Sequence, residues 1–283
     1  MGSCDALNNT HIEKLEQVDR IFFRRLFQVP NCTAIEAFYL ETASIPIRFI
    51  LMGRRLLYLW DILNKNKSEL VQRFYKSQKA FSVRNDWVIQ VQEDLNICGL
   101  NFSDEEISKL KRITFKKLVM EKIQALAAQY LIALKTKHTK SINLEYSKEM
   151  QSYLCNESMK IEDKKLMFRI RNRLVDVKAN YRGKYLDLAC RLCLASEESQ
   201  SHLLSCVVIL SDQNVKDSLQ GYVYNDIFSK DPKIQADMIN IWKRILKTRN
   251  QKLRNPASNE DSSSQASPLF GASYYDNIVR HWI

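Results

Sequence analysis

Three cysteines and one histidine are grouped in a way that constrains how the C-terminal half of this chain can fold. The group reads Cys190, two residues, Cys193, eight residues, His202, three residues, Cys206. Two cysteines two residues apart can chelate one ion from a tight turn, and a His and a Cys at i and i+4 project from one face of a helix. Three thiolates and one imidazole complete the tetrahedral shell that Zn²⁺ prefers and leave no position for a substrate. The spacing therefore predicts one structural zinc ion, with a chance group of buried reduced cysteines as the alternative.

The remaining cysteines and the N-terminus give an expectation about cellular location. Cys4, Cys32, Cys98 and Cys155 stand singly, and the total of seven cysteines is odd. Residues 1–9 contain neither the cationic nor the apolar part of a secretory signal. We therefore expect reduced thiols and an intracellular protein of the nucleus or cytoplasm, because disulfides persist mainly in oxidising compartments.

The longest apolar stretch, residues 45–63, bears on a membrane location. It is interrupted by Arg48, Arg54, Arg55 and Asp61, and charged side chains are costly in lipid. The sequence thus predicts no membrane-spanning segment.

The composition favours an all-α fold. The chain has six glycines and five prolines among 283 residues, against about 20 and about 14 at average usage. Glycine supplies the backbone conformations of tight β-hairpin turns, whereas the abundant Leu, Ile, Lys, Glu, Gln and Arg are helix formers. We expect a multi-helix bundle, then a small zinc module, then further helices.

Start signals and apolar periodicity predict where the helices lie. A Ser or Thr followed three residues later by Glu forms a capping box that starts a helix, and this pattern occurs at Thr10, Thr33 and Ser103. Helices are expected over residues 10–29, 34–41, 46–63, 68–80, 85–96, 103–140, 163–177, 197–210, 214–229 and 232–247. The apolar positions expected to face the core are Ile12, Leu15, Phe22 and Leu26 in the first helix, and Phe115, Val119, Ile123, Leu126, Tyr130 and Leu134 in the longest.

These elements suggest six consecutive segments. A helical segment covers residues 1–100, a basic segment with the long helix covers 101–180, and the CCHC zinc knuckle covers 181–212. C-terminal helices over 213–250 precede a disordered linker over 251–273, which is rich in Ser, Asn and Pro. A short tail covers 274–283.

The charge balance points to a polyanionic partner. Lys and Arg outnumber Asp and Glu to give a formal net charge of +11, which favours phosphate backbones through the release of condensed counterions. Two basic stretches, around 109–140 and 160–191, precede and adjoin the zinc spacing, and the second interleaves aromatic side chains with its cations, as single-strand-binding surfaces do. Solvated helix faces and buried aromatics would give the same pattern. The predicted nucleic-acid contacts are Lys109, Lys111, Arg112, Lys116, Lys117, Lys135, Lys137, Lys140, Lys164, Lys165, Arg169, Arg171, Arg173, Arg182, Lys184 and Arg191.

Catalytic motifs are absent from the sequence. It has no Tyr-x-Asp-Asp polymerase motif, no Walker A loop and no Gly-x-Gly-x-x-Gly loop. His11, His138 and His281 lie near no nucleophile pattern, and Asp104 to Glu106 fits the acidic first turn of a helix better than a catalytic carboxylate pair. We therefore predict a protein that is not an enzyme and takes no small-molecule substrate.

Several blocks of the sequence resemble the region that follows the reverse-transcriptase core in non-LTR (LINE-type) retrotransposon polyproteins. The most specific is the zinc spacing preceded by Phe168-Arg-Ile-Arg-Asn-Arg173 and Asn180-Tyr181. Next comes Phe38-Tyr-Leu-Glu-Thr-Ala-Ser-Ile-Pro-Ile-Arg48 followed by Arg54-Arg-Leu-Leu-Tyr-Leu59. The resemblance spans roughly residues 10–250. One departure is Ala43, where the family pattern usually has glycine at a turn between helices.

The resemblance implies a role in gripping template RNA or target DNA during target-primed reverse transcription, with residues 1–100 as a helical post-polymerase segment adjacent to the thumb. The polymerase portion of the same element would then be a further partner, and the catalytic residues would lie outside this chain. The chain could be a truncated element copy or a host-adopted gene. The competing hypothesis is a protein-interaction scaffold in which zinc only staples helices together.

Overall fold

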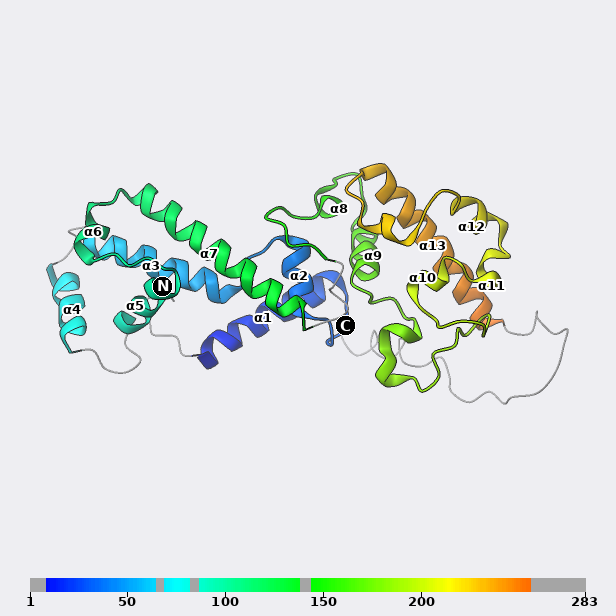
Figure 1. Ribbon diagram of the computed structural model, residues 1–283, viewed down its shortest axis with the longest axis horizontal. Helices are drawn as coiled ribbons and strands as arrows, with labels where there is room; N and C mark the ends of the chain where they lie inside the picture. Colours follow the sequence, from blue (N-terminus) through cyan, green and yellow to red (C-terminus); the bar gives the residue numbers. More distant parts are fainter. Residues whose placement is uncertain (1–8, 65–68, 82–86, 138–143, 256–283) are drawn as a thin grey trace, which may run out of the picture.

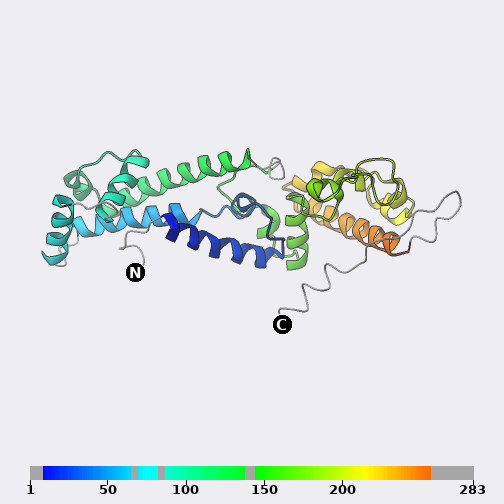
Figure 2. The same ribbon diagram turned by 90° about the horizontal axis from the view of Figure 1, so that it is seen from below.

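The computed structural model describes residues 9–64, 69–81, 87–137 and 144–255, and these residues form an elongated all-α protein (Figures 1 and 2). The all-α prediction is confirmed: within the described ranges, strand pairing is limited to one isolated bridge between Ala189 and Glu197. No helix in the described part of the chain is both long enough and apolar enough to span a membrane.

The helices follow the chain in two groups. The first consists of α1 (Asn9–Phe27), α2 (Ile35–Thr42), α3 (Ile47–Asn64), α4 (Glu69–Ala80), α5 (Trp87–Ile97), α6 (Asp104–Lys109) and α7 (Arg112–Lys135). The second consists of α8 (Ser152–Cys155), α9 (Ile161–Arg171), the 3₁₀ helix η2 (Lys178–Lys184), α10 (Gln200–Leu203), α11 (Val207–Leu210), α12 (Gln213–Ser218), the 3₁₀ helix η3 (Tyr224–Phe228) and α13 (Pro232–Arg254).

Helices α3 to α7 surround one hydrophobic core at one end of the molecule (Figure 1). Leu56 and Leu59 of α3 pack with Phe115 and Val119 of α7, and all four are at most 1% exposed. A buried ion pair of 2.7 Å between Arg55 and Asp94 ties α3 to α5.

A second core joins α1, α2 and the helices after residue 144. Its centre is an aromatic stack in which the rings of Phe27 and Phe168 lie 4.0 Å apart and those of Phe38 and Phe168 lie 5.4 Å apart. Arg171 of α9 adds a buried ion pair of 2.9 Å to Glu41 of α2. The two cores group the helices differently from the predicted segments, because α7 completes the core of α3 and α5.

The prediction for the buried face of α1 is wrong. Leu15, Phe22 and Leu26 are 40%, 57% and 42% exposed, whereas Phe23 and Phe27 are buried. Phe23 and Phe27, spaced i and i+4, both stack on the Phe38 ring. Helix α1 has two apolar faces of similar periodicity, and this contact with α2 determines which of them is buried.

The prediction for α7 holds for its first half only. Phe115, Val119 and Ile123 are buried, but the buried positions continue at Ala127 and Leu131 instead of the expected Leu126, Tyr130 and Leu134, which are half-buried. The buried face rotates because α7 packs first against α3 and then against α2.

The predicted capping boxes have different outcomes. Ser103 and Glu106 form the expected box, but the helix it starts is only α6, since Leu110 is extended and α7 begins separately. The helix expected from Thr33 is capped instead by Ala34, without a side-chain hydrogen bond. Thr10 already lies inside α1, so it does not cap that helix.

Other boundaries also differ from the predicted ones. Helix α9 ends at Arg171, where a helix to residue 177 was expected, because Arg173 takes a left-handed backbone conformation with φ 53°. The helix expected over 214–229 is divided into α12 and η3. Helix α13 continues to Arg254, so the predicted linker over 251–273 begins in helix. Residues 256–273 of that linker and the predicted tail over 274–283 lie outside the described residues.

Candidate metal centre

The four predicted ligands converge although they come from three separate pieces of chain. Cys190 and Cys193 lie in the loop after η2, His202 lies on α10, and Cys206 is the residue that caps α11. Their ligand atoms all lie within 4.8 Å of one another. The group can hold a metal ion.

The distances fit a tetrahedral ion. Metal–sulfur bonds of about 2.3 Å at tetrahedral angles put two sulfur ligands about 3.8 Å apart. The Cys190 and Cys206 sulfur atoms are 3.9 Å apart, and the Cys193 sulfur is 3.2 Å from Nε2 of His202. Three sulfurs and one nitrogen fill such a shell, so the centre has no position for a substrate.

A short loop brings the first two cysteines together. The Cys190 N–H donates to the Ser196 carbonyl at 2.7 Å, and the Leu194 N–H donates to the Cys190 carbonyl at 3.0 Å. Leu194 has a φ of 57°, which turns the chain directly after Cys193. The tight turn expected from the two-residue spacing is therefore present.

The single helix predicted over 197–210 is wrong. Helix α10 ends at Leu203, and α11 begins at Val207. His202 and Cys206 consequently meet across a helix break and do not share one helical face. Ser199 caps α10 by accepting a hydrogen bond from the His202 N–H at 3.0 Å. This bond positions the backbone of His202, from which the imidazole extends.

The thiols differ in their surroundings. Burial raises the pKa of the Cys206 thiol to about 11. Desolvation acts in the same direction on Cys193, but hydrogen bonds from the backbone at Ala195 and from neighbouring thiols outweigh it, so the pKa of Cys193 is lowered. Cys190 and Cys206 are fully buried, whereas Cys193 and His202 are half-buried.

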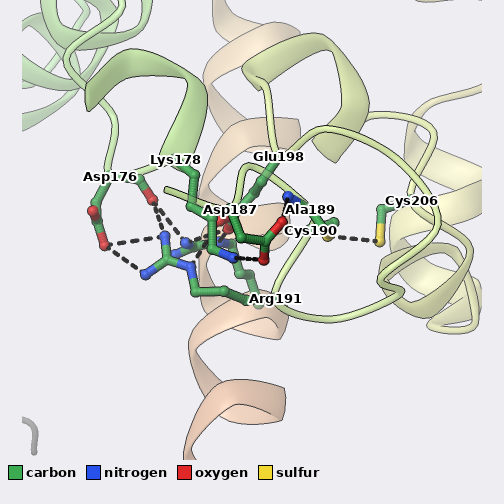
Figure 3. A network of polar contacts seen from close by, with 9 residues as sticks. Asp176, Lys178, Asp187, Ala189, Cys190, Arg191, Glu198 and Cys206 are labelled. Atoms are coloured by element: carbon green, nitrogen blue, oxygen red, sulfur yellow. Dashed lines mark hydrogen bonds and ion pairs between the residues drawn. The ribbon is translucent and has the colours of Figure 1, made fainter. Parts of the chain in front are cut away.

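A buried carboxylate anchors the cysteine loop to the last helix. Glu198 is 0% exposed, and its two oxygens accept hydrogen bonds from Arg191 and from Arg249 of α13, each at 2.7 Å. Both arginines also donate to the Asp176 carbonyl, at 2.9 and 2.7 Å. Figure 3 shows this network next to the facing sulfur atoms of Cys190 and Cys206.

Glu198 and Arg249 were not among the predicted site residues. Glu198 follows Glu197 among Ser and Gln residues, and such a polar context predicts an exposed side chain. The helix predicted over 232–247 ended before Arg249, which is 3% exposed.

The predicted nucleic-acid contacts divide into two groups. Exposed Lys109, Lys111, Arg112, Lys116 and Lys117 lie where α6 leads into α7. In both views, which have the long axis horizontal, this end of the molecule is opposite the end that carries α10 and α11 (Figures 1 and 2). The cations around the start of α7 therefore do not form one surface with the metal centre. Lys135 is half-buried and Lys137 exposed near the other end of α7, and Lys140 lies outside the described residues.

The second group lies nearer the centre, but several of its members already have protein partners. Lys164 donates to the Leu154 carbonyl at 2.7 Å, and Lys165 pairs with Glu162 at 2.9 Å. Arg191 is held by Glu198, as described above. Arg169 and Arg173 are half-buried, and Arg182 and Lys184 are exposed.

Arg171 corrects the prediction most clearly. Its side chain is buried, and it donates to Glu41, to Gln151 and to the Ile227 carbonyl. A guanidinium with this many internal partners is not accessible to a phosphate.

Comparisons with other proteins do not assign the centre. No protein-family model, no curated protein and no solved structure matches the chain.

Proposed function

We propose that this chain is a zinc-stabilised nucleic-acid-binding module with no catalytic centre of its own. The observation that carries the proposal is the convergence of three sulfurs and one imidazole nitrogen within 4.8 Å. Zn²⁺ is the ion that best fits this donor set and geometry, and a closed shell of four protein ligands is typical of structural sites.

The nucleic-acid part of the proposal rests on charge. The net charge of +11 is accompanied by exposed cations at both ends of the elongated molecule. Arg182 and Lys184 are exposed on η2, which comes directly before the cysteine loop in the chain. Each phosphate that such cations neutralise releases counterions, which favours binding at low salt.

The resemblance to the region after the reverse-transcriptase core supports a place in a non-LTR retrotransposon protein, and it rests on the sequence blocks alone. Ala43 bears on one of these blocks, because its left-handed conformation, with φ 53°, is the one that glycine adopts most readily at this turn. Within that proposal the module grips template RNA or target DNA beside a polymerase.

A salt-titrated binding assay tests the function. We expect labelled single-stranded RNA, single-stranded DNA or duplex DNA to bind at low ionic strength, with an affinity that falls linearly in a plot of log K against log salt. Chelation of the metal should weaken binding, because Arg182 pairs with Glu197, which lies in the chain between the ligands Cys193 and His202. Absence of binding to all three probes at low salt would refute the proposal.

One observation favours the second candidate, a protein-interaction scaffold. Leu15, Val18, Phe22 and Leu26 form an exposed apolar stripe along α1. Concentration-dependent self-association or a protein partner that is lost in a Leu15→Ser/Phe22→Ser variant, together with no nucleic-acid binding, would favour this function over the first.

A further inference from the structure

Two adjoining cavities lie beside the metal centre and share Ser201 and Tyr224 in their walls. One has a volume of about 550 Å³ and the other about 570 Å³. Each falls in the range of roughly 300–1,000 Å³ that is usual for small-ligand sites. Neither contains a metal ligand in its lining.

The first cavity is polar. Arg173 and Arg182 line it, together with Tyr224. Glu197 pairs with Arg182 and leaves this cavity with one positive charge in excess. Such a lining suits a single anionic group, such as a phosphate.

The amide in the wall of the first cavity is held rigidly. The Gln200 side chain donates to the Ile170 carbonyl at 2.9 Å and accepts from Asn180 at 3.0 Å. Its orientation is fixed before any ligand arrives. Preorganised polar groups of this kind fix the orientation of a bound ligand.

The second cavity has more apolar walls. Leu204, Leu210, Leu219 and Tyr222 line it, and Lys216 and Asp217 add one charge of each sign. Aromatic and aliphatic side chains of this kind provide surfaces on which a planar base can stack.

We propose that the two cavities together bind one unpaired nucleotide of a single-stranded nucleic acid. The phosphate lies against Arg173 and Arg182, and the base enters the apolar cavity on the other side of Tyr224. A duplex cannot supply this ligand, because its bases are stacked and paired, whereas loops and single strands can splay a base outward. The inference rests on the proposed function and adds where, and in which form, the nucleic acid binds.

The cavity wall is tied to the metal centre. Helix α10 carries Gln200 and Ser201, which line the first cavity, together with the ligand His202. Loss of the ion should therefore disturb the nucleotide site.

The test uses the full chain with zinc bound and a fluorescent oligouridylate ten-mer as the probe. Arg173→Gln and Arg182→Gln each remove one cation from the cavity, and Lys230→Gln removes one exposed cation that lines neither cavity. Charge-assisted hydrogen bonds are worth enough that Arg173→Gln should weaken binding by about tenfold, against less than about twofold for Lys230→Gln. Arg182 is well exposed, so its substitution reports on binding even if Arg173→Gln lowers stability.

A crosslinking experiment and a comparison with duplex test the nucleotide site separately from the wider proposal. A ten-mer carrying 4-thiouridine should crosslink on irradiation to the peptide that contains Tyr222 and Tyr224, and a matched duplex should bind more weakly than the single strand. Equal losses for all three variants, crosslinks only elsewhere, or tighter binding of the duplex would overturn the nucleotide site and leave the wider proposal standing. No binding of any nucleic acid at low salt would overturn both.

Discussion

Arg249, near the end of α13, donates two hydrogen bonds to the fully buried carboxylate of Glu198, five residues beyond the second cysteine of the metal centre. This pair joins the cysteine loop to the helix that runs behind it. Arg191 uses the other oxygen of the same carboxylate and also pairs with Asp176 at 3.4 Å, whereas Glu198 is the carboxylate that pairs with Arg249.

Glu198→Gln should therefore be strongly destabilising. The substitution keeps the shape of the side chain but leaves the buried guanidinium of Arg249 without a counter-charge, which typically costs about 3–5 kcal/mol. Urea unfolding followed by circular dichroism measures the free energy of unfolding.

The control for this variant is an exposed ion pair between α7 and α3, at the surface of the core that these two helices share. Arg112 pairs with Asp61 at 3.2 Å, and its side chain is 49% exposed. Arg112→Gln should change the free energy of unfolding by less than about 1 kcal/mol. A similar small change for Glu198→Gln would mean that the pair does not hold the loop.

Removal of the metal should unfold only part of the molecule. Binding of a structural zinc ion is coupled to folding, so chelation or Cys190→Ser/Cys193→Ser should increase amide hydrogen exchange over residues 186–210. Exchange in α3 and α7 should stay slow, because they pack in the separate core of Leu56 and Phe115.

Metal content of the purified chain completes this prediction. We expect one zinc per chain, lost in the double variant and retained in Cys155→Ser, which removes an exposed cysteine outside the cluster. Full zinc content in the double variant would exclude the centre.

The sequence was sufficient for the fold class, most helices and the four converging ligands. Helical periodicity and a chelating spacing are local signals, so they do not depend on how distant parts of the chain pack. The cysteine turn was predicted correctly because two cysteines two residues apart are a local signal. The continuous helix predicted from His202 to Cys206 was wrong. A helix break between two short helices gives no periodic signal.

Features that depend on distant partners were not predictable from local patterns. Arg171 looked like a member of a basic surface, yet its partner Glu41 comes from 130 residues away. The division of the cations between the two ends of the molecule likewise follows from the path of α7, which begins, with Lys116 and Lys117, at the end away from the metal centre (Figure 1).

The buried face of α1 provides a test with neighbouring residues. Phe23→Ala should cost about 3–5 kcal/mol, because it opens a cavity in the aromatic stack. Phe22→Ala removes a ring that is 57% exposed and should cost less than about 1 kcal/mol, in line with surface substitutions. Both are measured by urea unfolding, and equal costs would contradict the orientation of α1.

The same substitution, alanine to glycine, should change the free energy of unfolding in opposite directions at Ala43 and at a second alanine. It follows α2 with φ 53° and ψ 25°, a conformation that is strained for residues with a Cβ and natural for glycine. Ala43→Gly should therefore raise the free energy of unfolding by about 1 kcal/mol, since glycine is the favoured residue at this position of a helix end. The matched control is Ala125→Gly on the exposed face of α7, where glycine should lower it by about 1 kcal/mol through its low helix propensity. Thermal and urea unfolding of the two variants measures both shifts, and destabilisation by Ala43→Gly would mean that this turn does not have the left-handed geometry.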